Sequence, residues 1–250
     1  RDGEGRWWLS IPAEVPEIKR CYHWNPVGVD IGIAYLLTVS DEGAVPPVES
    51  TRMAGGVGMC NPRWYRALMP ERRRLQRKIS RLAYQNNPHA YEADGKTMKK
   101  GARFTHMSRR HRDALDAKRK LEGEIRRQRE HYWHLVTDWL VRAYNPIVIE
   151  DLSVGWLLQN RRTAMSAADA AFFKFWTLLG YKAQEAGVHV IKVNPAYTSQ
   201  TCGACGHVSA ENRKRQARFA CVACGAVMNA DVNAAHNILQ RGLDSLEGIV

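Results

Sequence analysis

The sequence predicts an α/β protein in which a mixed sheet is interrupted by a basic helical insertion and by a cysteine-rich insertion. Short apolar, β-branched runs near residues 27–40, 147–149 and 188–193 predict the strands. A long stretch of helical spacing between 71 and 144 is rich in Lys and Arg, and four cysteines follow in two C-x2-C pairs. The 250 residues are 45% hydrophobic, which is enough for one sizeable core or two small ones.

The first 26 residues contain one strand-like piece, RWWLSI, at 6–11. A lone strand is not stable in water, so it is expected to pair with another segment. Because the chain begins with Arg1 rather than Met, we expect it to be a fragment, with residues 1–26 as the remnant of an N-terminal β domain. No apolar run approaches the ~20 residues that span a bilayer, and no signal peptide is visible. The net charge of +12 favours a polyanionic partner, nucleic acid ahead of a membrane surface, and we expect no membrane partner.

Residues 27–40 predict a hairpin of buried strands, the first from Val27 to Ile33 and the second from about Ala34 to Ser40. Asp30 lies in the first strand. A buried, unpaired carboxylate is costly, so Asp30 needs a metal ion, a cation or several hydrogen bonds. An ordinary strand aspartate satisfied by hydrogen bonds fits this pattern equally well.

Two helices are predicted next, joined by a polar linker at 86–106. The first spans Glu71 to Gln85, and the second runs from about Ser108 to Tyr144 with an apolar face that includes Leu135 and Trp139. Between Glu71 and His131 there are 19 Lys/Arg against 8 Asp/Glu, so this section holds nearly all of the net charge of +12. Such an excess favours phosphate contacts over a merely solvated face. The candidates on the first helix are Arg72, Arg73, Arg74, Arg77, Lys78 and Arg81.

A second carboxylate, Glu150, follows the predicted strand at 147–149. Open α/β sheets place their ligands at the carboxyl ends of strands, although solvated charges at strand ends are also common. A helix is predicted from Ser166 to Ala186 with Gly187 as its C′ residue, and a strand from Val188 to Val193 follows.

The four cysteines, Cys202, Cys205, Cys221 and Cys224, have the C-x2-C-x15-C-x2-C spacing of a zinc ribbon. Two disulfides or four unrelated thiols are the alternatives, and the spacing favours zinc over both. A four-thiolate site leaves no open position, so the zinc is expected to be structural. Cys21 and Cys60 remain as ordinary thiols, which fits a reducing cytoplasm.

Asp231 begins a predicted helix of about 231–240 that ends at Gly242. Asp231 can be its N-cap, a metal ligand, or both. The order Asp30, Glu150, Asp231 on a β-β…β-α-β…α pattern matches an RNase H-like fold with a catalytic Asp-Glu-Asp set. Converging carboxylates repel one another unless cations neutralise them, and hard oxygen ligands favour Mg²⁺ or Mn²⁺. Two such ions serve phosphodiester hydrolysis by activating water and stabilising the leaving oxygen.

Three motifs, GVDIGI, IVIEDL and NADVNAA, with the cysteine pairs between the second and third, resemble the split RuvC nuclease of the transposon-encoded TnpB (OrfB) family. Type V CRISPR effectors are similar. LQRKISR at 75–81 resembles that family's first insertion helix, and YTSQTC at 197–202 its entry to the ribbon. The resemblance covers residues 27 to about 242. It implies RuvC parts at 27–60, 145–196 and 229–250, a basic helical insertion at 61–144, a zinc ribbon that binds target nucleic acid at 197–228, and a wedge-like remnant at 1–26.

The resemblance further implies an RNA-guided DNA endonuclease of a prokaryotic cytoplasm, with guide RNA and target DNA as partners. Asp30, Glu150 and Asp231 would be its magnesium-binding catalytic residues, and the N-terminal recognition regions of that family are expected to be missing. Two other classes stay open: a guide-directed or zinc-ribbon DNA-binding protein without cleavage, and a guide-free resolvase or transposase. The ribbon residues expected to contact DNA near the cut are Arg213, Lys214, Arg215 and Arg218.

Overall fold

The computed structural model describes residues 23–152, 164–215 and 217–247, together with residues 5, 7, 9, 11 and 12. The chain divides into two compact units, one of residues 1–15 and 63–129 and the other of residues 16–62 and 130–250. Helix α3 (Arg109–Ala143) contributes residues to both units. The strand expected at 6–11 lies largely outside the described residues, and its described members are not in a strand.

The larger unit is built on a six-stranded mixed sheet of order β3-β4-β2-β1-β5-β6. Strands β1, β2, β4 and β3 pair antiparallel in turn, whereas β5 and β6 run parallel to β1. The predicted hairpin and both later strands are confirmed, while β3 and β4 were not predicted. The strands are β1 (Val27–Ile31), β2 (Tyr35–Val39), β3 (Ser50–Met53), β4 (Gly56–Cys60), β5 (Ile147–Glu150) and β6 (Val190–Val193).

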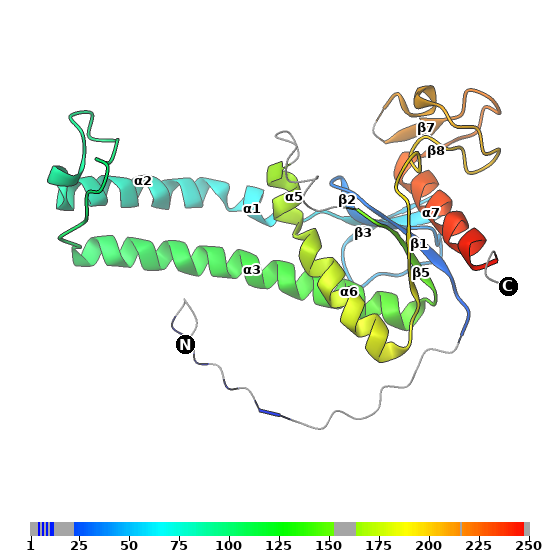
Figure 1. The fold of residues 1–250 in the computed structure, drawn as a ribbon, viewed down its shortest axis with the longest axis horizontal. Helices are drawn as coiled ribbons and strands as arrows, with labels where there is room; N and C mark the ends of the chain where they lie inside the picture. The colour runs from blue at the N-terminus through cyan, green and yellow to red at the C-terminus, as the bar shows by residue number, and fades with distance from the viewer. Residues whose placement is uncertain are drawn as a thin grey trace. The chain divides into compact units, whose positions relative to one another are not determined.

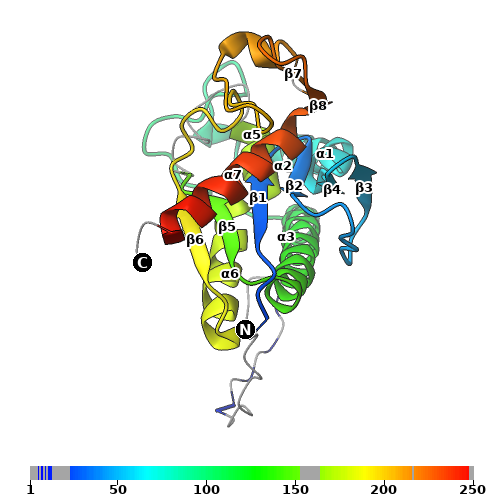
Figure 2. The ribbon, with the colours of Figure 1, turned by 90° about the vertical axis from the view of Figure 1, so that its right-hand side faces the viewer.

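Helices cover both faces of this sheet. Helix α7 (Ala230–Glu247) crosses one face over β1 and β5, as Figure 2 shows. Helix α6 (Phe172–Ala186) and the part of α3 from residue 130 onward lie on the other face (Figure 1). There the buried Trp133 ring packs against Phe172 and Phe175, and its indole N–H donates to the carbonyl of Ala170 at 2.8 Å.

Two glycines let α7 approach the sheet closely. A Cβ on Gly28 would lie 2.0 Å from the carbonyl oxygen of Ala235 and 2.7 Å from the amide nitrogen of Leu239. A Cβ on Gly242 would lie 2.5 Å from a methyl group of Val148. Gly242 was predicted to end the helix, and this is wrong: α7 continues to residue 247, and the glycine is required by close packing instead.

The smaller unit is a pair of helices with a loop between them. Helix α1 (Trp64–Ala67) leads into α2 (Met69–Asn86), and η1 (Pro88–Ala90) begins the loop before α3. Arg72 near the start of α2 pairs with Glu122 of α3 at 3.4 Å, while Asn86 at its end donates to Ser108 at 3.0 Å, so the helices run antiparallel. Both predicted helices are confirmed. Their facing side chains, Leu75, Ile79, Leu121 and Ile125, are buried.

The expected apolar face is wrong in the last third of α3. Leu135 is exposed and Trp139 only half-buried, whereas Trp133, Val136 and Leu140 are fully buried. The buried face changes because residues from 130 onward pack in the sheet-containing unit rather than against α2.

The helix predicted over 166–186 is two helices. Ala171 has a left-handed backbone conformation, with φ of 55°, and separates α5 (Ala164–Ala170) from α6. Gly187 ends α6 in the left-handed region, with φ of 66°, as expected. Among the helices of the described residues, none has the length and apolar character that a membrane span needs.

Candidate active site

Asp30 and Glu150 are neighbours at the carboxyl ends of two parallel strands. Val29 pairs with Ile149, so the next residue of each strand is one of the two acids. Side chains alternate between the faces of a sheet, so Asp30 shares a face with Gly28, and Glu150 shares one with Val148. Because α7 packs on both Gly28 and Val148, both acids lie on the face that α7 covers.

Asp231 reaches the same place from the first turn of α7. It precedes Ala235, the residue seated on Gly28, by one helical turn, which brings it toward the end of β1 that holds Asp30. The suggestion that Asp231 is the N-cap is wrong. The side chain of Asn229 accepts from the amides of Asp231 and Val232 at 2.8 and 3.2 Å, so the Asp231 carboxylate stays available for other partners.

The three carboxylates interact electrostatically. Burial, followed by the charges of Glu150 and Asp231, raises the pKa of Asp30 well above its usual value. Asp30 keeps part of its surface exposed, but protein surrounds its carboxylate closely. Burial also raises the pKa of Glu150 and of Asp231. The fold therefore gathers the three acids named from the sequence, in a site whose like charges favour a bound cation.

Within the described residues, Arg213 is the one cationic side chain that forms an ion pair with a carboxylate of this cluster. Its Nη2 lies 3.0 Å from Oδ1 of Asp231. The positive charge of Arg213 lowers the pKa of Asp231 and so opposes the larger effect of burial, which raises it. Arg213 belongs to η2 (Ala210–Arg213) in the cysteine-rich segment. The sequence suggested a DNA contact for Arg213, and it did not reveal the pairing with Asp231.

Glu150 is oriented by a hydroxyl from the segment that follows β6. The Oγ1 of Thr198 donates a short hydrogen bond of 2.5 Å to Oε1 of Glu150. We call residues 194–203, which lead from β6 into the first cysteine pair, the strap. Both Glu150 and Thr198 are buried, so this bond depends on the placement of the strap.

Helix α7 holds the strap with three polar side chains spaced four residues apart. Asn233 donates to the carbonyl of Thr201 and accepts from the amide of Gly203, at 2.8 and 3.0 Å. Asn237 donates to the carbonyls of Thr198 and Thr201 at 2.8 and 2.7 Å. One turn on, Arg241 donates to two more strap carbonyls at 2.8 and 2.7 Å. The N-x3-N-x3-R spacing is visible in the sequence, but its role was missed.

The four cysteines converge. Their sulfur atoms all lie within 4.8 Å of one another, and the pairs Cys202–Cys224 and Cys205–Cys221 are each 3.7 Å apart. A disulfide bond is ~2.05 Å long, which excludes the disulfide alternative. Tetrahedral zinc with Zn–S bonds of ~2.3 Å has sulfurs ~3.8 Å apart, so the site fits zinc. Within the described residues no other His, Cys, Asp or Glu group is so tightly gathered, and the three carboxylates are spaced more widely.

The cysteine pairs sit in two equivalent turns. Each ends in a glycine with positive φ, 74° at Gly206 and 76° at Gly225, and each glycine amide donates to the carbonyl of the first cysteine of its pair. The buried Asn212 joins the turns by accepting from the amide of Val222 and donating to the carbonyl of His207. The small hairpin of β7 (Arg218–Ala220) and β8 (Val227–Asn229) then leads into α7.

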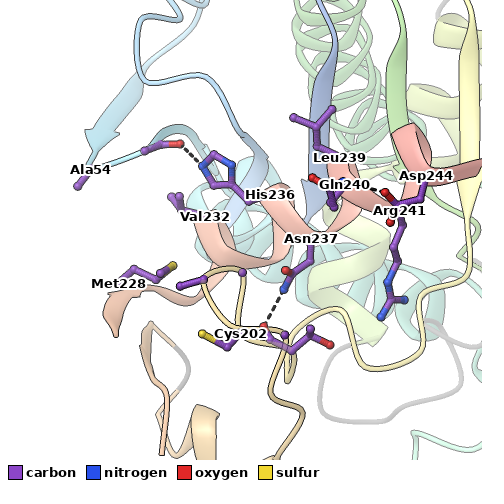
Figure 3. Close-up of a pocket in the computed structure, with 15 residues that line it drawn as sticks. Ala54, Cys202, Met228, Val232, His236, Asn237, Leu239, Gln240, Arg241 and Asp244 are labelled. Atoms are coloured by element: carbon purple, nitrogen blue, oxygen red, sulfur yellow. Dashed lines mark hydrogen bonds between the residues drawn. The ribbon is translucent and has the colours of Figure 1, made fainter. Parts of the chain in front are cut away.

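A cavity of about 590 Å³ lies beside α7, between the β3–β4 turn and the first cysteine turn (Figure 3). His236 crosses it from α7, with its Nε2 2.7 Å from the carbonyl oxygen of Gly55. Its lining includes none of the three carboxylates. The cavity is therefore distinct from the acidic site.

The candidate nucleic-acid contacts lie on two surfaces. On α2, Arg72 is engaged by Glu122 and by the ring of Tyr65, 5.0 Å from its guanidinium, whereas the other five basic residues are exposed. In the cysteine-rich segment, Lys214 pairs with Glu211 at 2.7 Å. The exposed basic residues of the two surfaces are Arg73, Arg74, Arg77, Lys78 and Arg81 on α2, and Lys214, Arg215 and Arg218 in the cysteine-rich segment.

Comparison with known proteins agrees with this arrangement. Residues 10–161, more than half of the chain, match the OrfB_IS605 family model, described as "Probable transposase". The chain belongs to the OrfB_IS605 family. Residues 172–238 also match the model described as "Cas12f1-like, TNB domain", a span that holds the four cysteines and Asp231.

Relatives of this OrfB_IS605 protein are longer. Over 95% of the chain it is 31% identical to the Escherichia coli K12 protein named "Putative RNA-guided DNA endonuclease InsQ", of which it covers 54%. Over 26% of the chain it is 53% identical to the Cas12f1 endodeoxyribonuclease of Sulfoacidibacillus thermotolerans, of which it covers 16%. The chain spans about half the length of the curated relatives it matches along most of its length. Its fold resembles Cas12f1 in a complex with guide RNA and target DNA, with a TM-score of 0.54 at 18% identity over 90% of this chain and 40% of that one.

Proposed function

We propose that this chain is the catalytic part of an RNA-guided DNA endonuclease that hydrolyses phosphodiesters with divalent metal ions. The sheet, in which β5 and β6 run parallel to β1 beside an antiparallel β1-β2-β4-β3 half, supports an RNase H-like fold of the RuvC type. In this proposal the RuvC parts are residues 27–60, 145–196 and 229–250. The helical segment 61–144 and the cysteine-rich segment 197–228 are insertions.

One observation carries the proposal. Three carboxylates from β1, β5 and α7 interact on one face at the carboxyl ends of parallel strands, and the charges of two of them raise the pKa of Asp30. The repulsion among three buried carboxylates destabilises the folded protein unless a bound cation or a proton neutralises part of their charge. The all-oxygen donor set fits Mg²⁺ or Mn²⁺ rather than zinc.

In this site Asp30, Glu150 and Asp231 would hold two divalent ions. When bound, these ions supply activation of water and stabilisation of the leaving oxygen. Thr198 holds one oxygen of Glu150 in a fixed direction and leaves the other oxygen free to coordinate. Arg213 places a guanidinium beside Asp231, where it can pair with a phosphate oxygen of the substrate.

The other parts take supporting roles. The four cysteines would hold a structural zinc ion, which fixes η2 and with it Arg213. The exposed cations of α2 and of the cysteine-rich segment would contact the backbones of guide RNA and target DNA. Guide RNA and target DNA are proposed as partners from the names of the relatives and from the fold shared with Cas12f1.

The test begins with RNA that co-purifies with the protein. That RNA is sequenced, a matching DNA duplex is made, and cleavage in Mg²⁺ is compared between the wild type, Glu150→Gln and the matched exposed variant Glu49→Gln. We expect Glu150→Gln to lose cleavage by several orders of magnitude while its bound RNA and zinc content stay normal, and Glu49→Gln to cut normally.

The other outcomes are informative. Bound RNA without cleavage by the wild type would indicate a guided DNA-binding protein, and cleavage of branched DNA without RNA would indicate a resolvase or transposase. Cleavage by Glu150→Gln at the wild-type rate would overturn the assignment of the site.

A further inference from the structure

The loop between α2 and α3, residues 87–108, has a defined conformation that its own polar groups maintain. We call it the tip. The buried side chain of Asn87 accepts from the amides of Thr105 and His106 at 2.8 and 2.9 Å and donates to the carbonyl of His106 at 2.8 Å. Tyr91 and Met98 form an antiparallel bridge. These bonds tie both ends of the loop to the end of α2, so the side chains of the tip are presented in fixed positions.

Three aromatic rings meet at the tip. Tyr91 and Phe104 are stacked, with ring centroids 6.1 Å apart and planes 21° from parallel, and Tyr84 meets Tyr91 edge-on at 5.5 Å. Phe104 remains 43% exposed and Tyr84 40% exposed, and Met98 beside them is also exposed. The rings therefore support one another while leaving much of their surface to solvent, an arrangement that a binding partner would cover.

The same segment is strongly basic. Between residues 84 and 110 the only acidic residues are Glu92 and Asp94. Asp94 is occupied within the loop, accepting from the amides of Lys96 and Thr97 and from the Thr97 hydroxyl. Across residues 84–110, all of which the structure describes, no Lys or Arg forms an ion pair. The six cations are Lys96, Lys99, Lys100, Arg103, Arg109 and Arg110.

We propose that the tip binds unpaired nucleotides, with a base stacked on Phe104 and the flanking phosphates held by the neighbouring cations. An exposed ring within a basic surface is the combination by which proteins bind single-stranded nucleic acid, since every base has a face that can stack. Bases inside a duplex are already stacked, so the aromatic group adds affinity only for an unpaired base or a strand end. This inference rests on the proposed function for its choice of nucleic acid as partner, and it requires neither metal nor cleavage.

Binding is measured in the Glu150→Gln background so that no substrate is cut. Fluorescent oligonucleotides of about 12 nucleotides, one RNA and one DNA, are compared with a blunt duplex of the same sequence. We expect Phe104→Ala to weaken single-strand binding by roughly 5- to 100-fold, the range of base stacking on one aromatic side chain, and Phe104→Trp to restore it. The tryptophan of that variant should be quenched when the oligonucleotide binds. The RNA and DNA arms show which strand the tip prefers.

Two controls separate stacking from charge. Phe173→Ala removes a ring on α6 that is more exposed than Phe104, 73% against 43%, and should leave binding unchanged. Arg103→Ala should lower the salt dependence of binding by about one counterion, whereas Phe104→Ala should not. Because Phe104 is exposed, circular dichroism should show Phe104→Ala folded.

Wild-type affinity in Phe104→Ala, or an equal loss for single strand and duplex, would overturn the proposal. So would binding of the tip to anionic phospholipid vesicles with no affinity for the oligonucleotides. None of these results depends on whether the wild type cuts DNA, so the failure of this inference and the failure of the proposed function are distinguishable.

Discussion

The guanidinium of Arg213 and the carboxylate of Asp231 form an ion pair at 3.0 Å that joins the cysteine-rich segment to the acidic site. Both side chains are largely shielded from solvent, so the pair is more than a surface salt bridge. Through it, the segment that holds the four cysteines is joined directly to the carboxylate cluster on the sheet.

Arg213→Ala is expected to lower the rate of DNA cleavage by roughly 10²-fold or more, the range for loss of one preorganised charged donor. Zinc content and melting temperature should change little. The measurement is single-turnover cleavage in Mg²⁺, with Arg142→Ala, an exposed arginine of α3, as the matched control. An unchanged rate in Arg213→Ala would limit the ion pair to a structural role.

Asn237→Ala is expected to cost about 1–3 kcal/mol of folding free energy, because it leaves the carbonyl of Thr198 without its donor and removes one of the two donors to the carbonyl of Thr201. Cleavage should fall as well, since Thr198 would no longer hold Glu150 in place. Urea unfolding and cleavage are measured together. The control is Gln240→Ala, one turn away on the exposed side of α7 and bonded only to Asp244. Equal stability of the two variants would contradict this account of the strap.

Gly28→Ala is expected to destabilise the protein by about 3 kcal/mol or more, because the new methyl group would meet backbone atoms of α7 that cannot rotate away. Gly180→Ala has open space around it on α6 and should instead stabilise by about 0.5–1 kcal/mol. Opposite shifts in the urea midpoint are the expected result. A small effect of Gly28→Ala would mean that α7 can move away from β1 at little cost.

Cys221→Ser is expected to abolish zinc binding and to unfold the cysteine-rich segment, because zinc binding supplies folding free energy to such sites. Metal analysis should show one zinc ion per chain in the wild type and none in the variant, together with loss of cleavage. Cys60→Ser, outside the cluster, should retain zinc. Soluble, fully active Cys221→Ser would argue against a structural zinc ion.

Asp30→Asn is expected to remove activity and to raise stability when Mg²⁺ is absent. The folded-state pKa of Asp30 is raised, so its protonated form favours folding and that contribution is lost as pH rises above the usual range of a carboxyl group. Melting temperatures from pH 4 to 8 in Mg²⁺-free buffer should fall less steeply for Asp30→Asn than for the wild type. Parallel curves would show that Asp30 is not held in an unfavourable environment.

The strands and the acids were predictable because their signals are local. Short apolar runs bounded by turns predicted β1, β2, β5 and β6, and two acids stand in or directly after such runs. Strands β3 and β4 were not predicted because Ser50–Met53 has one apolar residue and because two of the five residues of Gly56–Cys60 are glycines, which are depleted in strands.

The errors concern residues whose roles depend on distant partners. A glycine near the end of a helical pattern resembles a cap, and only the approach of Val148 shows why Gly242 lies inside α7. The pairing of Arg213 with Asp231 and the bonds from Asn237 to the strap likewise join residues that only the fold brings together.

The cysteine-rich segment starts and finishes on one helix. Its entry is tied to Asn233 through Thr201 and Gly203, and its exit, β8, continues directly into α7. Since both ends are fixed, lengthening a loop between them costs little, because each doubling of loop length adds only about 0.6 kcal/mol of closure entropy. The connection between η2 and β7, which follows Arg213, is thus the place where evolution can lengthen or exchange the segment while the ion pair of Arg213 and the carboxylates keep their alignment.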